Sequence, residues 1–441
     1  MKTLLLILGL AFASLARASA GETLQLKLAP DQRLLLTGEP RECVVKIDLT
    51  SCVAPTKNRR GPVNIAAVLD RSGSMTGAKI EKAKQGVIEL IDQLASNDTF
   101  SLVAYDSAVQ VLVPAQKIED REELKRRVQR IEAGGSTALY EGVERGAAEL
   151  KKFCRENNIN RVLLLSDGLA NVGPSSTEEL RGLGRRLAAR GLSVSTIGVG
   201  DDYNEDLMCR LAEASDANYY YVRDAEKLPD IFAKELGQLL AVTARDIRVE
   251  IVCPDGVEPI DLLGRPEKFS GRKACVELSP FASGQSRYLF LRCKVAADRE
   301  VERRDLATVK LSYVDDLNGA RAQSSAQTVQ VGFTKNESDA RKSVDAAIFA
   351  QRELQTNALI KDKALAESDA GKNREAGQTL NAQADKLEAA AKAAPAEWQT
   401  RLNEEAQNAR RRAARLDAEP MSAGLRKEIQ NESWQQKNAK Q

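Results

Sequence analysis

The stretch NIAAVLDRSGSM, residues 64–75, places an apolar run directly before an aspartate and two serines. The run 65–69 is typical of a strand that is buried on both faces in a parallel sheet. The polar residues Asp70, Ser72 and Ser74 then fall where this strand must end. Oxygen-bearing side chains at alternating positions suit a simple turn, and they equally suit half of a metal site. This stretch alone leaves both interpretations open.

Strand-like and helix-like segments alternate on both sides of this stretch, from residue 61 to residue 240. The alternation predicts an α/β fold with a doubly wound, mostly parallel six-stranded sheet. The predicted strands are residues 64–70, 99–106, 109–115, 161–167, 192–200 and 218–222. The second and third strands are too close in sequence for a crossover connection, so we expect them to form an antiparallel hairpin at the edge of the sheet.

The first 20 residues have the pattern of a secretory signal peptide. Lys2 precedes an apolar run from Leu4 to Leu15, and Ala18-Ser19-Ala20 follows as a small-residue cleavage signal. The run is shorter than the ~18 residues that a membrane-spanning helix needs, so an uncleaved anchor is the less favoured alternative. We therefore expect a secreted, periplasmic or extracellular protein with no transmembrane segment after signal cleavage.

Two segments outside the α/β region alternate like half-exposed strands. Residues 21–60 predict a short N-terminal β segment. Residues 243–334 contain short strand-like runs separated by Gly, Pro, Asp and Asn, which is the pattern of a β-sandwich. One hypothesis is that the N-terminal segment joins this sandwich, with the α/β domain inserted between the two parts.

The composition changes again near the C-terminus. Residues 335–418 are rich in Ala, Glu, Lys, Gln and Arg, and they predict an α-helical region of roughly three helices. A spacer, or a coiled coil that makes a homo-oligomer through this helical tail, is the expectation here. The densest basic run, Arg410–Arg412, is interpreted as a solvated face of a helix. Residues 419–441 predict a polar, disordered tail.

The composition also excludes several classes of function. The chain has 65 Lys and Arg against 63 Asp and Glu, which gives no electrostatic case for nucleic-acid binding. It has no histidine, so Ser–His and Cys–His nucleophile pairs and HExxH metalloprotease chemistry are absent. Its seven cysteines suit an oxidising compartment but form no CxxC motif, and their pairing is left open. We expect a protein that is not an enzyme.

Polar residues recur where other predicted strands and helices meet the same edge of the sheet. Asp167 ends the fourth predicted strand in LLLSDG, and Thr137 closes the loop GGST just before a predicted helix. The strand ends and helix-entry loops of an open α/β sheet meet along its carboxyl edge. The sequence therefore predicts that five oxygen donors converge there: Asp70, Ser72, Ser74, Thr137 and Asp167. Hard oxygen donors select Mg²⁺, Mn²⁺ or Ca²⁺ over softer metals.

With these residues identified, the segment 61–240 resembles the von Willebrand factor type A (VWA) domain, the fold of integrin I domains. DRSGS at residues 70–74 matches the DxSxS motif of that family. Thr137 and Asp167 match the two remaining positions of its metal-ion-dependent adhesion site (MIDAS). The resemblance implies that the two serines and Thr137 bind the ion directly, and that the two aspartates act largely through ordered waters.

The same resemblance implies a function. Neutral hydroxyl ligands leave the charge of a divalent cation under-compensated, so the ion attracts an anionic ligand. The implied function is cell adhesion or protein–protein interaction, in which MIDAS-bound Mg²⁺ (or Mn²⁺ or Ca²⁺) binds an Asp or Glu carboxylate of a partner protein. The alternatives are a scaffold protein whose helical tail mediates assembly and, less favoured, a metal-dependent hydrolase that activates water.

The order of segments along the chain also resembles secreted proteins of the inter-alpha-trypsin inhibitor heavy chain and calcium-activated chloride channel regulator kind. The HExxH protease activity of the latter is not expected here, because the chain has no histidine. The predicted domains are a signal peptide at 1–20, a β segment at 21–60, a VWA domain at 61–240, a β-sandwich at 243–334, a helical region at 335–418 and a polar tail at 419–441.

Overall fold

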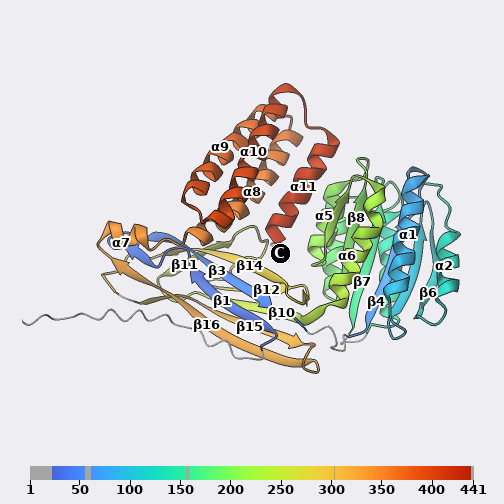
Figure 1. The fold of residues 1–441 in the computed structure, drawn as a ribbon, viewed down its shortest axis with the longest axis horizontal. Helices are drawn as coiled ribbons and strands as arrows, with labels where there is room; N and C mark the ends of the chain where they lie inside the picture. Colours follow the sequence, from blue (N-terminus) through green and yellow to red (C-terminus); the bar gives the residue numbers. More distant parts are fainter. Residues whose placement is uncertain (1–21, 55–60, 155–157, 302, 439–441) are drawn as a thin grey trace, which may run out of the picture.

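The structure is a computed structural model that describes residues 22–54, 61–154, 158–301 and 303–438. The expected signal peptide lies outside the described residues. Within the described residues, no helix is both long enough and apolar enough to cross a membrane. Figure 1 shows a β-sandwich, an α/β domain beside it and a bundle of helices that reaches both.

The α/β domain is built on one six-stranded sheet with the strand order β6-β5-β4-β7-β8-β9. Its strands are β4 (Val63–Asp70), β5 (Thr99–Tyr105), β6 (Val109–Lys117), β7 (Ile159–Ser166), β8 (Leu192–Val199) and β9 (Tyr219–Val222). All neighbouring strands are parallel except β5 and β6, which form an antiparallel pair at the edge. The predicted fold class, including this edge hairpin, is confirmed.

Helices cover both faces of this sheet, so every residue of β4 is buried. On one face lie α1 (Ala78–Gln93), α2 (Arg121–Gln129) and α6 (Leu228–Leu240), and on the other lie α3 (Leu139–Lys151), α4 (Thr177–Ala188) and α5 (Glu205–Ala214). Successive side chains of a strand point to opposite faces. Ile65, Ala67 and Leu69 accordingly lie in the first core, and Ala66 and Val68 lie in the second.

The β-sandwich combines strands from both sides of the α/β domain. One sheet has the order β1-β3-β14-β11, and the other has β12-β10-β15-β16-β2, with β13 paired to β10. The strands are β1 (Leu24–Pro30), β2 (Leu34–Leu36), β3 (Arg41–Ser51), β10 (Val242–Val252), β11 (Val257–Leu262), β12 (Lys273–Leu278), β13 (Phe281–Ala282), β14 (Ser286–Val295), β15 (Arg304–Asp315) and β16 (Arg321–Thr334). Because β3 pairs with β14 over ten residues, the α/β domain is an insertion between β3 and β10.

The C-terminal region consists of helices joined by short connections. Its helices are α7 (Glu337–Lys342), α8 (Ala346–Asp369), α9 (Asn373–Ala393), α10 (Ala396–Ala418) and α11 (Ala423–Asn438). Leu and Ala side chains of α8, α9 and α10 form the main core of the bundle. The prediction of a disordered tail over residues 419–441 is wrong where the structure describes it, because α11 buries Leu425, Ile429 and Trp434 against other elements.

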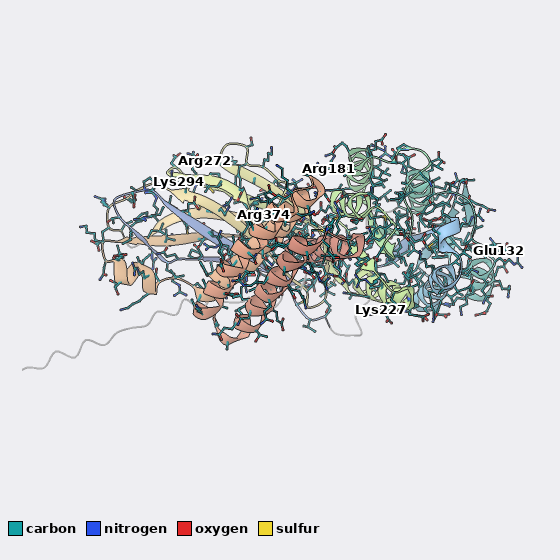
Figure 2. All side chains as sticks on the ribbon, turned by 90° about the horizontal axis from the view of Figure 1, so that it is seen from above. Glu132, Arg181, Lys227, Arg272, Lys294 and Arg374 are labelled. Carbon is teal, nitrogen blue, oxygen red and sulfur yellow. The ribbon has the colours of Figure 1, made fainter. Side chains whose placement is uncertain are left out.

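Helix α11 attaches the bundle to the α/β domain. The ring of Trp434 meets Tyr219 of β9 edge-on, with their centroids 6.3 Å apart. Lys427 Nζ lies 2.9 Å from a carboxylate oxygen of Glu205 in α5, and both side chains are buried. Viewed from above, the bundle lies over the junction of the sandwich and the α/β domain, while Glu132 and Arg272 point outward on opposite domains (Figure 2).

Candidate functional site

Two neighbouring strands bring the predicted acidic residues to one edge of the sheet. Strands β4 and β7 run parallel, with Leu69 paired to Leu165. Asp70 is the last residue of β4, and Asp167 directly follows β7. Both carboxylates therefore lie at the carboxyl edge, and both side chains are buried.

The serines of the loop after β4 join these two carboxylates. Ser72 Oγ lies 3.1 Å from Ser74 Oγ, and Ser74 Oγ donates a 2.7 Å hydrogen bond to Asp167 Oδ1. Asp70 accepts hydrogen bonds from the backbone N–H of Ser72 at 2.8 Å and from the hydroxyl of Ser166 at 2.7 Å. One oxygen of Asp70 therefore holds the loop after β4, and the other joins Asp70 to the end of β7.

The hydroxyl of Thr137 faces the same space as the two serines. A Cβ atom built on Gly168 would lie 3.3 Å from Thr137 Oγ1, 3.4 Å from Ser74 Oγ and 3.9 Å from Ser72 Oγ. Three hydroxyl oxygens thus lie around one point beside Gly168. Asn171 fixes the loop of Thr137, because its Oδ1 accepts a 2.8 Å hydrogen bond from the N–H of Thr137. Sequence reasoning missed Asn171, which belongs to no part of the motif.

Gly135 lets the loop that carries Thr137 come close to the loop after β4. Gly135 has a φ of +85°, and its carbonyl accepts a 3.0 Å hydrogen bond from the N–H of Gly73. A side chain at Gly135 would also meet Asp106, whose Cβ is 3.1 Å from the position of a built Cβ. Asp106 forms a 2.9 Å ion pair with Arg71, so it supports the loop next to the site.

Burial and charge at this edge favour a cation. Burial raises the pKa of Asp70, hydrogen bonds from Ser72 and Ser166 oppose this effect, and the charge of Asp167 raises the pKa further. Lys79 of α1 forms an ion pair with Asp167, with Nζ 2.5 Å from Oδ2. Sequence reasoning missed Lys79, although its position in the first turn of the helix after the serines was a usable signal.

The donor set fits a hard divalent cation. Three neutral hydroxyls and two carboxylates offer only oxygen, and the hydroxyls face one point. We refer to Asp70, Ser72, Ser74, Thr137 and Asp167 as the edge site. The structure brings all five together, as the motif spacing predicts, and adds Lys79 beside them.

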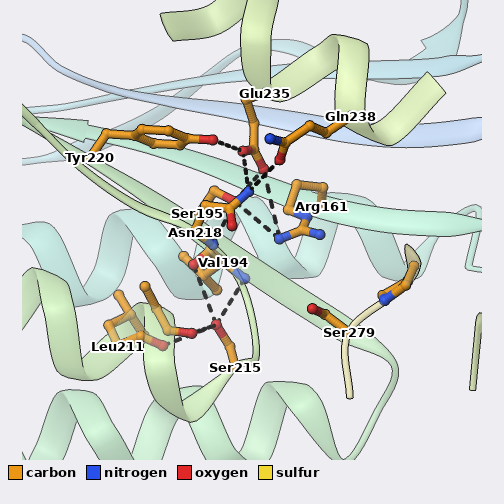
Figure 3. Close-up of polar contacts among 12 residues, drawn as sticks. Arg161, Val194, Ser195, Leu211, Ser215, Asn218, Tyr220, Glu235, Gln238 and Ser279 are labelled. Carbon is orange, nitrogen blue, oxygen red and sulfur yellow. Dashed lines mark hydrogen bonds and ion pairs between the residues drawn. The ribbon is translucent and has the colours of Figure 1, made fainter. Parts of the chain in front are cut away.

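A separate buried network fastens α6 to the sheet (Figure 3). The carboxylate of Glu235 accepts hydrogen bonds from Ser195 at 2.5 Å, Asn218 at 2.6 Å and Tyr220 at 2.7 Å. Arg161 Nη1 lies 3.8 Å from Glu235 and donates a 3.0 Å hydrogen bond to Ser195. Burial alone would raise the pKa of Glu235, but Arg161 and the three donors outweigh it and hold the pKa below its usual value. This network positions a helix and lies apart from the edge site.

Comparison with known proteins identifies the α/β domain. The model of the von Willebrand factor type A domain matches residues 64–234. Protein sll0103 of Synechocystis sp. is 30% identical over 171 residues, which make up 39% of this chain and 40% of that protein. Inter-alpha-trypsin inhibitor heavy chain H3 of Homo sapiens is 29% identical over 160 residues, which make up 34% of this chain and 18% of that protein. The chain thus spans less than half the length of these relatives.

Two solved structures match most of the chain and not only the α/β domain. The von Willebrand factor type A protein from Catenulispora acidiphila has a TM-score of 0.67 at 18% identity, over 83% of this chain and 87% of that one. The ArnB paralog VWA2 from Sulfolobus acidocaldarius has a TM-score of 0.60 at 16% identity, over 90% of this chain and 98% of that one. The likeness in fold therefore extends beyond the α/β domain. The VWA domain that the sequence resembles is confirmed by the match over residues 64–234. Residues 64–234 of this chain therefore form a von Willebrand factor type A domain.

Proposed function

We propose that this protein is a non-enzymatic adhesion or interaction module that binds a partner protein through a divalent cation at the edge site. The observation that supports the proposal is the convergence of three hydroxyl oxygens on the point above Gly168, beside two buried carboxylates. A VWA domain is typically such a module. The expected ion is Mg²⁺, with Mn²⁺ or Ca²⁺ as alternatives that share its preference for oxygen.

The residues of the edge site divide the work of holding the cation. Ser72, Ser74 and Thr137 would supply neutral direct ligands. Asp70 already accepts two hydrogen bonds from the protein, so it suits an indirect role through water. One oxygen of Asp167 is paired with Lys79, which lowers the negative charge that this residue offers to the ion.

This division of charge gives the proposed site its selectivity for an acidic partner. A bound divalent cation supplies electrostatic attraction for an anion at its open coordination position. The direct ligands would be hydroxyls that carry no charge, with the two carboxylates set further back, so an Asp or Glu carboxylate of a partner would complete the neutralisation. The expected signal peptide would bring this site outside the cytoplasm, where the partner is exposed.

A single substitution in the edge site tests the metal part of the proposal. Thr137→Ala removes one of the three converging hydroxyls, and we expect the affinity for Mg²⁺ to fall roughly tenfold or more, as measured by isothermal titration calorimetry. Ser136→Ala is the matched control, because it removes a hydroxyl from the neighbouring residue and keeps the backbone N–H that bonds Ser107. Equal Mg²⁺ affinity in the two variants would contradict the assignment of the site.

Partner capture tests the rest of the proposal. The full chain is immobilised and exposed to proteins of its native envelope or medium, in Mg²⁺ and in EDTA. We expect specific capture in Mg²⁺, its loss in EDTA and its loss in Asp70→Ala or Thr137→Ala. Capture that survives EDTA and both substitutions would contradict the proposal and would support the scaffold alternative, in which the helical region binds the partner.

A further inference from the structure

A polar pocket lies at the junction between the helical bundle and the VWA domain. Its volume is about 250 Å³. Four of its lining side chains are arginines, and two others are polar: Arg223, Arg411, Arg412, Arg415, Ser422 and Glu428. Arg223 follows β9 of the VWA domain, while the other arginines belong to α10. The pocket is therefore shared by two parts of the fold.

Only some of the positive charge in this pocket is neutralised by the protein. Arg412 forms a bidentate pair with Glu432, at 2.6 and 3.0 Å. Arg223 pairs with Glu428 at 2.7 Å. Among the described residues, no carboxylate pairs with Arg411, which contacts Asn408, and none pairs with Arg415. Two guanidinium groups thus line the pocket without a counter-charge.

The arginine run in the sequence is divided between three environments. Arg410 turns to α9, where it pairs with Asp385 at 2.6 Å and Glu388 at 3.0 Å. Arg412 is buried, which corrects the interpretation of the run as a solvated face. Arg411 contributes to the pocket, together with Arg415 one turn further along α10. The two arginines without a carboxylate partner are therefore the two that are free to bind a ligand.

We propose that this pocket binds a multivalent oxyanion of the phosphate or sulfate class, free or as an ester. Arginine presents a planar fork of donors that matches two oxygens of such an anion, and charge-assisted hydrogen bonds of this kind are strong. The hydroxyl of Ser422 accepts a hydrogen bond from the N–H of Leu425, so its own proton is available to the ligand. Ligand pockets for drug-sized molecules have volumes of about 300–1,000 Å³, so this smaller pocket suits a compact anion.

The position of the pocket gives the anion a structural consequence. Arg223 and Glu428 form an ion pair that joins the VWA domain to α11, and Arg411 and Arg415 face the same space from α10. An anion bound between Arg223 and α10 would add a link between the bundle and the VWA domain. Because it binds the folded form, it would also raise the thermal midpoint of the chain, by an amount that grows with the logarithm of its concentration above the Kd.

The experiment measures binding of inorganic pyrophosphate and of glycerol 3-phosphate to the full chain by isothermal titration calorimetry. The buffer contains EDTA, so that a cation at the edge site does not contribute, and the ionic strength is constant. We expect saturable 1:1 binding that weakens roughly tenfold or more in the double variant Arg411→Gln, Arg415→Gln. Tighter binding of one probe distinguishes a free from an esterified anion.

The matched control is Arg410→Gln, which removes a neighbouring arginine that turns away from the pocket. Its affinity for both probes should equal that of the wild type, and so should that of Thr137→Ala in the edge site. Circular dichroism and tryptophan fluorescence check that the exposed substitutions leave the fold intact. The proposal is overturned by the absence of saturable binding at millimolar probe, or by an equal loss of affinity in Arg410→Gln and the double variant.

Discussion

At the scale of single residues, Lys79 is the side chain that most affects the proposed cation site. Its Nζ lies 2.5 Å from Asp167 Oδ2, so the ammonium and the proposed divalent cation would share one carboxylate. Two unit positive charges about 4 Å apart repel by roughly 4 kcal/mol near a protein surface, a divalent cation doubles this value, and salt screens it. The lysine would therefore weaken cation binding while it keeps Asp167 from neutralising the proposed ion.

Replacement of this lysine should strengthen metal binding. We expect Lys79→Met to raise the affinity for Mg²⁺ roughly tenfold, because the competing charge is removed and Asp167 becomes available. Lys82→Met is the control, since Lys82 lies on the same helix and pairs with Glu226 at 2.6 Å. Calorimetric titration with Mg²⁺ measures both. Weaker Mg²⁺ binding in Lys79→Met would instead show that the lysine organises Asp167 for the ion.

The candidate site could be predicted from sequence only as far as strand topology allowed. Asp70 and Asp167 end strands that are predicted to be parallel, so their meeting at one edge follows from the fold class. Lys79 is placed near the site by its position in the first turn of α1, but its pairing with Asp167 depends on the direction of the side chain, which periodicity does not specify. The role of Asn171 depends on the path of the loop after β7, which no motif specifies.

At the scale of elements, the buried carboxylate of Glu235 holds α6 against the sheet. Glu235→Gln keeps the size of the side chain but leaves Arg161 buried without its counter-charge. The loss of one partner from a buried pair typically costs about 3–5 kcal/mol of stability. We expect a clearly lower midpoint for the VWA domain in urea unfolding followed by circular dichroism. Asp230→Asn, an exposed change on the same helix, is the control, and an equally small effect of both changes would contradict this role.

A second prediction at this scale concerns the acid stability of the helical bundle. Burial alone would raise the pKa of Glu432, but Arg412 and Lys361 outweigh it and lower the pKa from 4.5 to about 2. A carboxylate with a lowered pKa in the folded state stabilises the fold above its unfolded value, and this contribution is lost as the pH falls through the folded value. The bundle should therefore lose stability between about pH 4.5 and pH 2.

Tryptophan fluorescence can follow this acid transition, because both tryptophans of the chain, Trp398 and Trp434, lie in the helical region. In Glu432→Gln, the component of the transition between pH 4.5 and pH 2 should be absent. Glu388→Gln is the control, because Glu388 pairs with Arg410 on the surface and solvent screens that pair. An unchanged acid transition in Glu432→Gln would contradict the assignment.

Helix α11 marks the limit of prediction at this scale. The polar composition of residues 419–441 predicts disorder, because so few apolar side chains cannot sustain a helix alone. In the structure, Leu425, Ile429 and Trp434 are buried by neighbours that are distant in sequence. Most helical stability in proteins comes from such tertiary packing. A local pattern does not contain that contribution.

At the scale of the whole molecule, segments that are distant in the sequence pack against one another in several places. Strand β3 pairs with β14, which lies beyond the whole VWA domain, and α11 returns to pack on β9 and α5. Periodicity predicts the individual strands and helices, but these contacts between distant segments follow only from the three-dimensional arrangement. Removal of residues 335–441 would also uncover Tyr219 of the VWA domain, so point substitutions are the better tests of the helical region.

Trp434 is the residue whose loss should uncouple the bundle from the VWA domain. Its side chain is buried against Tyr219, and truncation of a buried Trp to Ala typically costs about 3–5 kcal/mol. In Trp434→Ala, we expect α11 to open locally, so that limited proteolysis cuts faster at residues 419–422, between α10 and α11. The affinity of the edge site for Mg²⁺ should stay unchanged, because Trp434 packs on β9 at the edge of the sheet, whereas the site lies at the ends of the central strands β4 and β7.

Trp398→Ala provides the matched control for this prediction, since it removes the other tryptophan from a partly buried position on α10 within the bundle. This variant should leave the rate of cleavage at residues 419–422 near that of the wild type. Helix α11 also contributes Glu428 to the polar pocket at the junction of the bundle and the VWA domain. The opening of α11 in Trp434→Ala should therefore weaken pyrophosphate binding as well. Equal cleavage rates in the two variants would show that the ion pairs of Lys427 and Arg426 with Glu205 hold α11 in place without the tryptophan.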